Sequence, residues 1–143
     1  MKSFTQLKDV KTVLVKDDAM IRNALSMAFK NKDCRLRVCK NGQQGLQDLR
    51  EERFDIVICD FRLPDMNGIE FFKLMGNRPS HILKILTSAY GDEKLRSQLS
   101  RVGVHGFIPK PFSVKQLLHV MVHLVEANRK NRRKSVQNDG FSE

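Results

Sequence analysis

The stretch IVICDFRLPDMNG, residues 56–68, decides the fold of this 143-residue chain. Its first four residues are continuously apolar rather than alternating, which is typical of a strand covered on both faces of a parallel sheet. Asp60 follows at once, and Pro64 and Gly68 are typical of a loop that leaves a strand. The stretch therefore predicts a buried central strand that ends at an aspartate.

Four further short apolar runs lie on either side of this strand, and segments with helical spacing separate them. Ile69, Phe72 and Met75 make one such helical stripe, with Asn67 as its N-cap, and a capping box at residues 113–116 starts the last helix. Five alternating strand and helix units predict an α/β fold with a doubly wound parallel sheet in the order 2-1-3-4-5. The apolar runs are 12–15, 36–39, 55–59, 82–86 and 105–108.

Composition places the chain among globular domains. Hydrophobic residues make up 41% and charged residues 29%, and the length suits one domain. No apolar run is long enough for a membrane span, and residues 1–11 lack the apolar middle of a secretory signal. Cys34, Cys39 and Cys59 show no metal-binding spacing, and Cys59 is expected in the core. We therefore expect a cytoplasmic protein.

The formal net charge of +10 is concentrated in two places. Residues 22–40 hold six bases against Asp33 alone, and residues 129–134 are also basic. A solvated basic face explains the first, although an acidic partner or nucleic acid would also suit it. No aromatic residues interleave these charges, so a nucleic-acid contact is not favoured.

Polar residues stand where four of the predicted strands end. Asp17 and Asp18 follow the first strand, Asp60 the third, Thr87 the fourth and Lys110 the fifth. Ligands of open α/β sheets bind at these carboxyl ends. Three carboxylates brought together there require a cation, and Mg²⁺ fits oxygen ligands. An aspartate in such a cleft can attack phosphorus, and a lysine and a hydroxyl can stabilise the charge that develops.

Each of these residues has an ordinary structural explanation when it is taken alone. Asp17 and Asp18 could cap a helix, Asp60 could belong to a turn, and Lys110 could be a surface lysine. His119 and His123 have a spacing that suits metal, but an exposed helix face explains them better. The joint placement at four strand ends is what these explanations do not account for.

Four blocks of this sequence resemble the signature blocks of response-regulator receiver domains. They are VLVKDD at 13–18, the stretch at 56–68, ILTSA at 85–89 and FIPKPF at 107–112, and the resemblance runs from about residue 11 to residue 128. It implies a flavodoxin-like (βα)5 fold in a chemotaxis-regulator-like protein. It also implies a phosphorylation switch rather than an enzyme, one that takes its phosphoryl group from a histidine kinase or histidine phosphotransfer protein.

The resemblance also assigns roles to individual residues. Asp60 corresponds to the phosphoacceptor, and Lys110 to the lysine that contacts the phosphoryl group. Thr87 and Phe107 correspond to the switch pair that changes the surface of the fourth helix, fifth strand and fifth helix. The Lys110–Pro111 bond is expected to be cis. The expected Mg²⁺ ligands are Asp17, Asp18, Asp60 and the backbone carbonyl of Arg62.

Three positions depart from the family pattern. Lys16, just before the acidic pair, is usually apolar or acidic there, and it either weakens metal affinity or points into solvent. Arg62 brings a long basic side chain to the cleft rim, where it could alter phosphoryl lifetime. Phe107 lacks the hydroxyl of a tyrosine, which a switch based on ring position does not need.

Residues 1–128 are thus predicted to form a receiver domain, and 129–143 a basic polar tail or linker. The basic run has two other readings, a nucleic-acid or acidic-partner contact and an extension of the last helix. Two other functions compete: a phosphatase of the haloacid-dehalogenase type, and a binding module that uses the basic surface. The sequence leaves open whether this domain acts on an output domain or on a separate output protein, and whether it forms a homodimer. No membrane contact is expected.

Overall fold

The computed structural model describes residues 5–16, 19–30, 34–77, 79–89 and 93–141. Within these ranges a 3-10 helix, Thr5–Leu7, precedes five strands that alternate with five helices. The elements are β1 (Lys11–Val15), α1 (Ala19–Lys30), β2 (Arg35–Cys39), α2 (Gly42–Glu51), β3 (Ile56–Asp60), α3 (Gly68–Met75), β4 (Leu83–Ser88), α4 (Glu93–Arg101), β5 (Gly106–Pro109) and α5 (Val114–Phe141).

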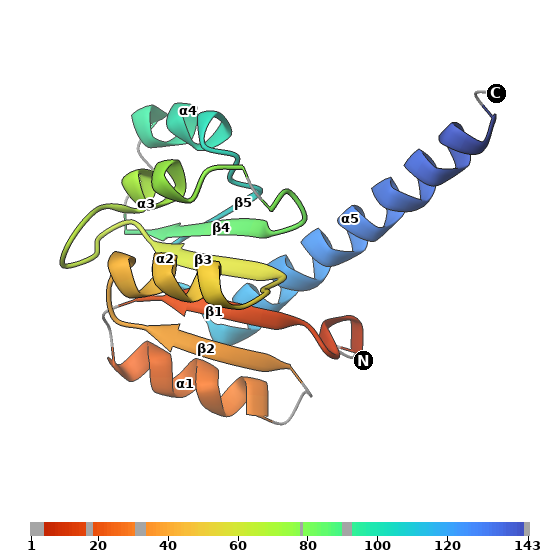
Figure 1. The fold of residues 1–143 in the computed structure, drawn as a ribbon. Coiled ribbons are helices and arrows are strands. Elements are labelled where there is room, and N and C mark those ends of the chain that lie inside the picture. Colours follow the sequence, from red (N-terminus) through yellow and green to blue (C-terminus); the bar gives the residue numbers. More distant parts are fainter. Residues whose placement is uncertain (1–4, 17–18, 31–33, 78, 90–92, 142–143) are drawn as a thin grey trace.

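All strand pairs are parallel, and the sheet order is β2-β1-β3-β4-β5, as the sequence predicts (Figure 1). All five residues of β3 are buried, which agrees with its continuous apolar run. β5 is an edge strand and ends at Pro109, a position where the missing backbone N–H is tolerated. The predicted fold class is therefore confirmed.

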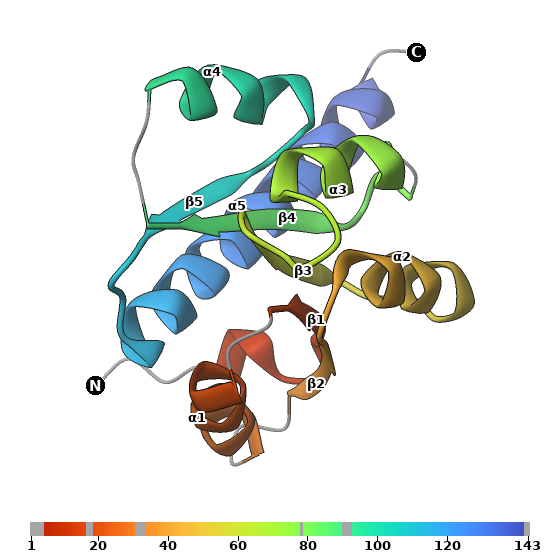
Figure 2. The ribbon, with the colours of Figure 1, turned by 90° about the vertical axis from the view of Figure 1, so that its left-hand side faces the viewer.

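Helices cover both faces of the sheet (Figure 2). On one face α2, α3 and α4 pack against the sheet, and residues such as Leu46, Phe72 and Leu99 build that core. On the other face α1 and α5 pack against it, with residues such as Leu25 and Leu117. Successive strand residues alternate between the two cores, because side chains of a strand point to opposite faces. Cys59 is buried in the first core, as expected.

Two predicted helix starts have the expected hydrogen bonds. The Asn67 side chain accepts a bond from the Glu70 backbone N–H at 2.9 Å. Ser113 Oγ accepts from the Gln116 N–H at 3.1 Å, and Gln116 Oε1 accepts from the Ser113 N–H at 2.7 Å. This reciprocal pair is a capping box, which satisfies two donors that a helix start leaves without partners.

The last helix differs from the simplest reading of the tail. α5 continues to Phe141 and projects away from the sheet (Figure 1). The predicted tail 129–143 is therefore helical through most of its length, which is the helix-extension reading. The physical reason lies in the composition, since neither glycine nor proline interrupts the chain between Ser113 and Gly140. No helix in the described part of the chain is both long and apolar enough to span a membrane.

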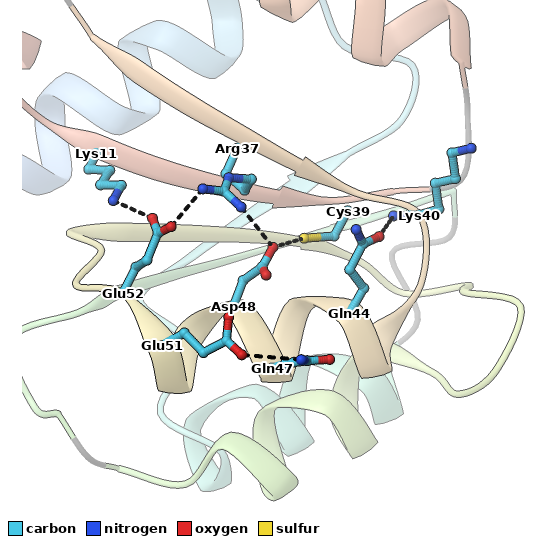
Figure 3. Close-up of polar contacts among 9 residues, drawn as sticks. All are labelled: Lys11, Arg37, Cys39, Lys40, Gln44, Gln47, Asp48, Glu51 and Glu52. Atoms are coloured by element: carbon cyan, nitrogen blue, oxygen red, sulfur yellow. Dashed lines mark hydrogen bonds and ion pairs between the residues drawn. The ribbon is translucent and has the colours of Figure 1, made fainter.

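Acidic side chains in α2 and at its C-cap, Asp48 and Glu52, neutralise part of the basic stretch on β2 (Figure 3). Arg37 pairs with Glu52 at 2.7 Å and with Asp48 at 3.8 Å, and Lys11 of β1 also pairs with Glu52. Cys39 Sγ donates to Asp48 at 3.0 Å, and burial together with this contact raises the pKa of the thiol to about 12. These contacts fasten α2 to the β2 edge and show that the basic stretch is partly an internal ion-pair network.

One buried charge within β4 is a structural feature that the sequence did not predict. Lys84 is 3% exposed, although it lies in an apolar run. Its ammonium donates to the carbonyls of Gly76 at 2.7 Å and Val102 at 3.4 Å. Burial lowers the pKa of Lys84, but the two carbonyls satisfy its donors. Lys84 therefore links the ends of α3 and α4 to the sheet.

Candidate functional site

The candidate site is a row of side chains at the carboxyl ends of adjacent strands. Asp60 is the last residue of β3, and Thr87 is its partner in register on β4. Ile58 and Ile85 pack in the core under α1 and α5. Asp60 and Thr87 lie two residues further along the same strands, so their side chains point to that same face of the sheet. Lys110 directly follows β5 and reaches the same place. Sequence reasoning predicted that these three residues converge, and the structure brings them together.

The Asp60 carboxylate is held by a hydroxyl and an ammonium. Thr87 Oγ1 donates to Asp60 Oδ1 at 3.0 Å. Lys110 Nζ lies 2.8 Å from Oδ1 and 2.9 Å from Oδ2, so it bridges both oxygens. The Asp60 side chain is 10% exposed and that of Lys110 28%, so the carboxylate sits at the floor of the site and the lysine at its rim. Hydrogen bonds between charged groups are stronger than neutral ones, so this geometry is well fixed.

Lys16 is a member of the site that sequence reasoning did not assign to it. Its Nζ lies 3.6 Å from Asp60 Oδ2, and its side chain is 2% exposed. The expectation that Lys16 points into solvent is therefore wrong. The missed signal was the alternation of β1: Leu14 packs in the core under α1 and α5, so two residues later Lys16 faces the same way.

The loop after Asp60 is fastened by backbone hydrogen bonds. The Phe61 N–H donates to the Thr87 carbonyl at 2.8 Å, and the Gly68 N–H donates to the Phe61 carbonyl at 2.7 Å. Gly68 is needed because a Cβ there would lie 3.0 Å from the Asp60 carbonyl oxygen and 2.4 Å from Leu86 Cδ1. The loop backbone therefore holds Asp60 in place and leaves no room for a side chain at position 68.

Asp65 ties this loop to the start of α2. Its two carboxylate oxygens accept from the backbone N–H groups of Gly42 and Gln43, each at 2.9 Å. Burial alone would raise the pKa of Asp65, but these hydrogen bonds outweigh it and lower the pKa. A carboxylate at a helix N-terminus also interacts favourably with the helix dipole. The loop that carries the acceptor aspartate is thus braced on a neighbouring helix.

The other predicted residues lie outside this cluster. Phe107 is half-buried on the opposite face of the sheet, against the core under α2, α3 and α4, and the Arg96 guanidinium lies 5.8 Å from its ring centroid. Arg62 is exposed in the loop, and its backbone forms an isolated antiparallel β-bridge with Asn67. Asp17 and Asp18 lie outside the described residues, so the acidic pair stays a prediction. The Lys110–Pro111 bond is cis, as expected.

The arrangement has a clear chemical character. A largely buried carboxylate, fixed by a hydroxyl and contacted by two ammonium groups, can act as a nucleophile whose product gains negative charge. The surrounding cations would stabilise that charge more strongly than in water, since the site is shielded. The neighbouring Cys59 is not a competing nucleophile, because burial and the nearby Asp60 charge raise the pKa of its thiol well above the usual value.

The sequence matches the family model described as the response regulator receiver domain over residues 12–122. A Bacillus subtilis protein, sporulation initiation phosphotransferase F, is 30% identical over 75% of this chain and 86% of its own length. The transcriptional activator protein PfeR of Pseudomonas aeruginosa is 31% identical over 80% of this chain. That match spans 37% of the length of PfeR, so this chain corresponds to little more than a third of that regulator.

Solved structures show the same fold. A CheY-like receiver domain protein of Methanospirillum hungatei superposes with a TM-score of 0.81 at 20% identity, covering 87% of this chain and 99% of that one. The non-phosphorylated receiver domain of HemR from Leptospira biflexa gives a TM-score of 0.76 at 25% identity, covering 82% and 94%. The first likeness concerns the fold alone, and it agrees with the observed strand order.

Proposed function

Because the chain belongs to the response regulator receiver domain family, we propose that it is a two-component signalling switch in which Asp60 accepts a phosphoryl group. The observation that supports this most is the Asp60 carboxylate itself, which is nearly buried at the end of β3 between Thr87 and Lys110. The donor is a phosphohistidine of a histidine kinase or of a histidine phosphotransfer protein.

The transfer step follows from this geometry. A carboxylate oxygen of Asp60 attacks phosphorus and forms a new O–P bond, while the P–N bond to the donor histidine breaks. The bonding electrons leave with the imidazole, which accepts a proton. Lys110 remains beside the acceptor and balances the charge on the phosphoryl oxygens, and the Thr87 hydroxyl turns from Asp60 Oδ1 to one of those oxygens. No water or reductant is consumed.

A divalent cation belongs to this proposal. The Asp60 carboxylate offers a hard oxygen ligand at the floor of the site, and the chemistry of that donor fits Mg²⁺. Asp17, Asp18 and the Arg62 carbonyl are proposed as its other ligands. When bound, the ion neutralises charge on the phosphoryl oxygens.

The signal would travel from Thr87 to the α4–β5–α5 surface. Leu86, beside Thr87, pairs with Phe107 on β5, so movement of the hydroxyl is transmitted to the strand that carries the ring. Phosphorylation then shifts the population between two positions of Phe107 rather than creating a new fold. The Arg96 contact stabilises the ring position seen here by a cation–π interaction.

The proposal also covers the partners on which the switch acts. The output is either a further domain joined through the helical extension of α5 or a separate protein, and phosphorylation could also promote a homodimer. All three cysteines are free thiols, which suits the reducing cytoplasm. Catalysis is limited to the chain's own phosphorylation and dephosphorylation.

The test is phosphorylation by a small acyl phosphate with Mg²⁺, followed by intact-mass measurement. Wild type should gain one phosphoryl group, and Asp60→Asn should gain none. Asp65→Asn is the matched control, because it removes an aspartate from the same loop without touching the acceptor. An adduct of equal size on Asp60→Asn would contradict the proposal. So would a folded wild type that takes no phosphoryl group from either the acyl phosphate or a phosphorylated histidine phosphotransfer protein.

A further inference from the structure

Lys16 occupies a place in the site that its position in the sheet dictates. The residue follows β1, and its backbone N–H donates to the Cys39 carbonyl at 2.9 Å. The β1–β3 register pairs Val15 with Cys59, so the next residues, Lys16 and Asp60, are neighbours across the sheet. Thr87 continues the row on β4. The row therefore runs lysine, aspartate, threonine across three adjacent strands.

The Lys16 ammonium is a fixed charge. The residue is 1% exposed, and its Nζ lies 5.9 Å from the centroid of the Phe112 ring. A surface lysine can swing into solvent, and salt screens its charge. A buried ammonium cannot swing into solvent, and salt screens its charge much less. Its burial is costly unless anions compensate the charge. Asp60, at 3.6 Å, supplies part of that compensation.

The acceptor carboxylate thus has two ammonium groups within ion-pair distance. Lys110 approaches from the rim, and Lys16 approaches from inside the sheet on the Oδ2 side. A divalent cation bound to the same carboxylate would lie close to the Lys16 ammonium. Like charges at such range repel one another. A charge within about 4–6 Å shifts the proton affinity of a neighbouring group by roughly 1–3 pKa units, and a comparable effect on a bound cation is a change in affinity of about tenfold or more.

We propose that Lys16 is a second cation built into the acceptor site, and that it takes over part of the charge that a divalent ion would otherwise supply at Asp60. This inference rests on the proposed function, since it concerns the same acceptor. It implies that this chain binds Mg²⁺ weakly and depends less on it than a site without the lysine. Lys16 is a positioning and charge-balancing residue, and Asp60 remains the nucleophile.

The test is a calorimetric titration of the unphosphorylated full chain with Mg²⁺ alone. Lys16→Met keeps the length of the side chain and removes its charge, and it should bind Mg²⁺ about tenfold more tightly than wild type. Lys16→Arg keeps the charge and should stay near wild type. Lys11→Met is the matched control: it removes a lysine from the other end of the same strand, and its Mg²⁺ affinity should not change.

Equal Mg²⁺ affinity of wild type and Lys16→Met would overturn the inference, and so would the absence of Mg²⁺ binding in both. If Lys16→Met does not fold, Lys16→Gln, which also removes the charge, takes its place in the same Mg²⁺ titration with the same expected result. A second readout is the phosphoryl adduct formed with an acyl phosphate in the presence of a chelator. Wild type should retain a fraction of its adduct, and Lys16→Met should lose it. Failure of the proposed function looks different, because no variant would then form an adduct even with Mg²⁺.

Discussion

Replacing Gly68 by alanine tests how tightly the acceptor loop is packed. The added Cβ would lie 2.4 Å from Leu86 Cδ1, 3.0 Å from the Asp60 carbonyl oxygen and 3.1 Å from Phe61 Cα. Favourable contacts between carbon atoms lie at about 3.5–4.0 Å. The Leu86 side chain can give way, but the two backbone atoms can move only if the loop that carries Asp60 moves.

Overpacking of this kind costs about 1–3 kcal/mol, and the involvement of backbone places Gly68→Ala in the upper half of that range. At this chain length, each kcal/mol lowers the melting temperature by roughly 2–4 °C. The assay is urea unfolding followed by circular dichroism, with the phosphoryl adduct measured on the same preparation. We expect a loss of about 2–3 kcal/mol and a reduced adduct, because the Asp60 carbonyl is displaced.

Gly76→Ala is the matched comparison. Gly76 has a φ of 73° and no atom within 4 Å of its ideal Cβ position. With a ψ of −165° as well, it lies in a backbone region that glycine alone adopts readily. Its substitution therefore measures only the cost of that backbone conformation in a residue with a side chain, about 1–3 kcal/mol, and should leave the adduct unchanged. A Gly68→Ala protein within about 0.5 kcal/mol of wild type, which is the ordinary range for a surface change, would refute the packing argument.

Three further predictions concern groups around the site. His105 Nδ1 accepts from the Lys84 backbone N–H at 2.9 Å, and partial burial together with the Lys84 charge lowers its pKa from the usual 6.5. Since the unfolded chain then takes up a proton first as the pH falls, stability should be full above about pH 6.5 and decline below it, and His105→Gln should remove this part of the pH dependence of urea unfolding. Asp65→Ala should cost about 1 kcal/mol in the same assay, because two N–H groups at the start of α2 lose their acceptor. Iodoacetamide should modify the half-buried Cys34 before the buried Cys39 in native protein, because burial and Asp48 raise the pKa of the Cys39 thiol to about 12, and peptide mapping checks the order.

A specific result would contradict each of these three predictions. A pH profile of stability that is the same for wild type and His105→Gln would show that the histidine does not titrate with folding. An Asp65→Ala protein as stable as wild type would mean that Asn41, whose side chain accepts from the Gln44 N–H at 2.8 Å, caps α2 sufficiently alone. Alkylation of Cys39 at the rate of Cys34 would show that the β2 edge opens readily in solution.

Much of the fold could be predicted because local pattern and global packing agree. The continuous apolar run of β3 indicates a strand buried on both faces, and the observed order places it in the middle of the sheet. The capping box at Ser113 depends only on residues three apart, and it forms as expected. The meeting of Asp60 with Thr87 follows from the rule that parallel strands bring their carboxyl ends to one edge.

Charged residues inside apolar runs were the part that the sequence did not reveal. Composition treats Lys16 and Lys84 as breaks in hydrophobic strands, and a lysine is rarely buried without partners. Their partners come from distant parts of the chain: Asp60 for Lys16, and the carbonyls of Gly76 and Val102 for Lys84. Such long-range compensation appears only when the strands are in register. The extension of α5 is one of three readings of the basic run, and the sequence favours the linker reading over it because the apolar stripe fades, although the helix-forming composition persists.

The most direct test of the central claim is to locate the phosphoryl group on the chain. Wild type phosphorylated by a histidine phosphotransfer protein in Mg²⁺ can be reduced with borohydride, which converts an aspartyl phosphate to homoserine, and then mapped by peptide mass spectrometry. We expect homoserine at position 60 and unchanged aspartate at position 65. Homoserine at position 65 or at any other aspartate, with an unmodified Asp60, would contradict it.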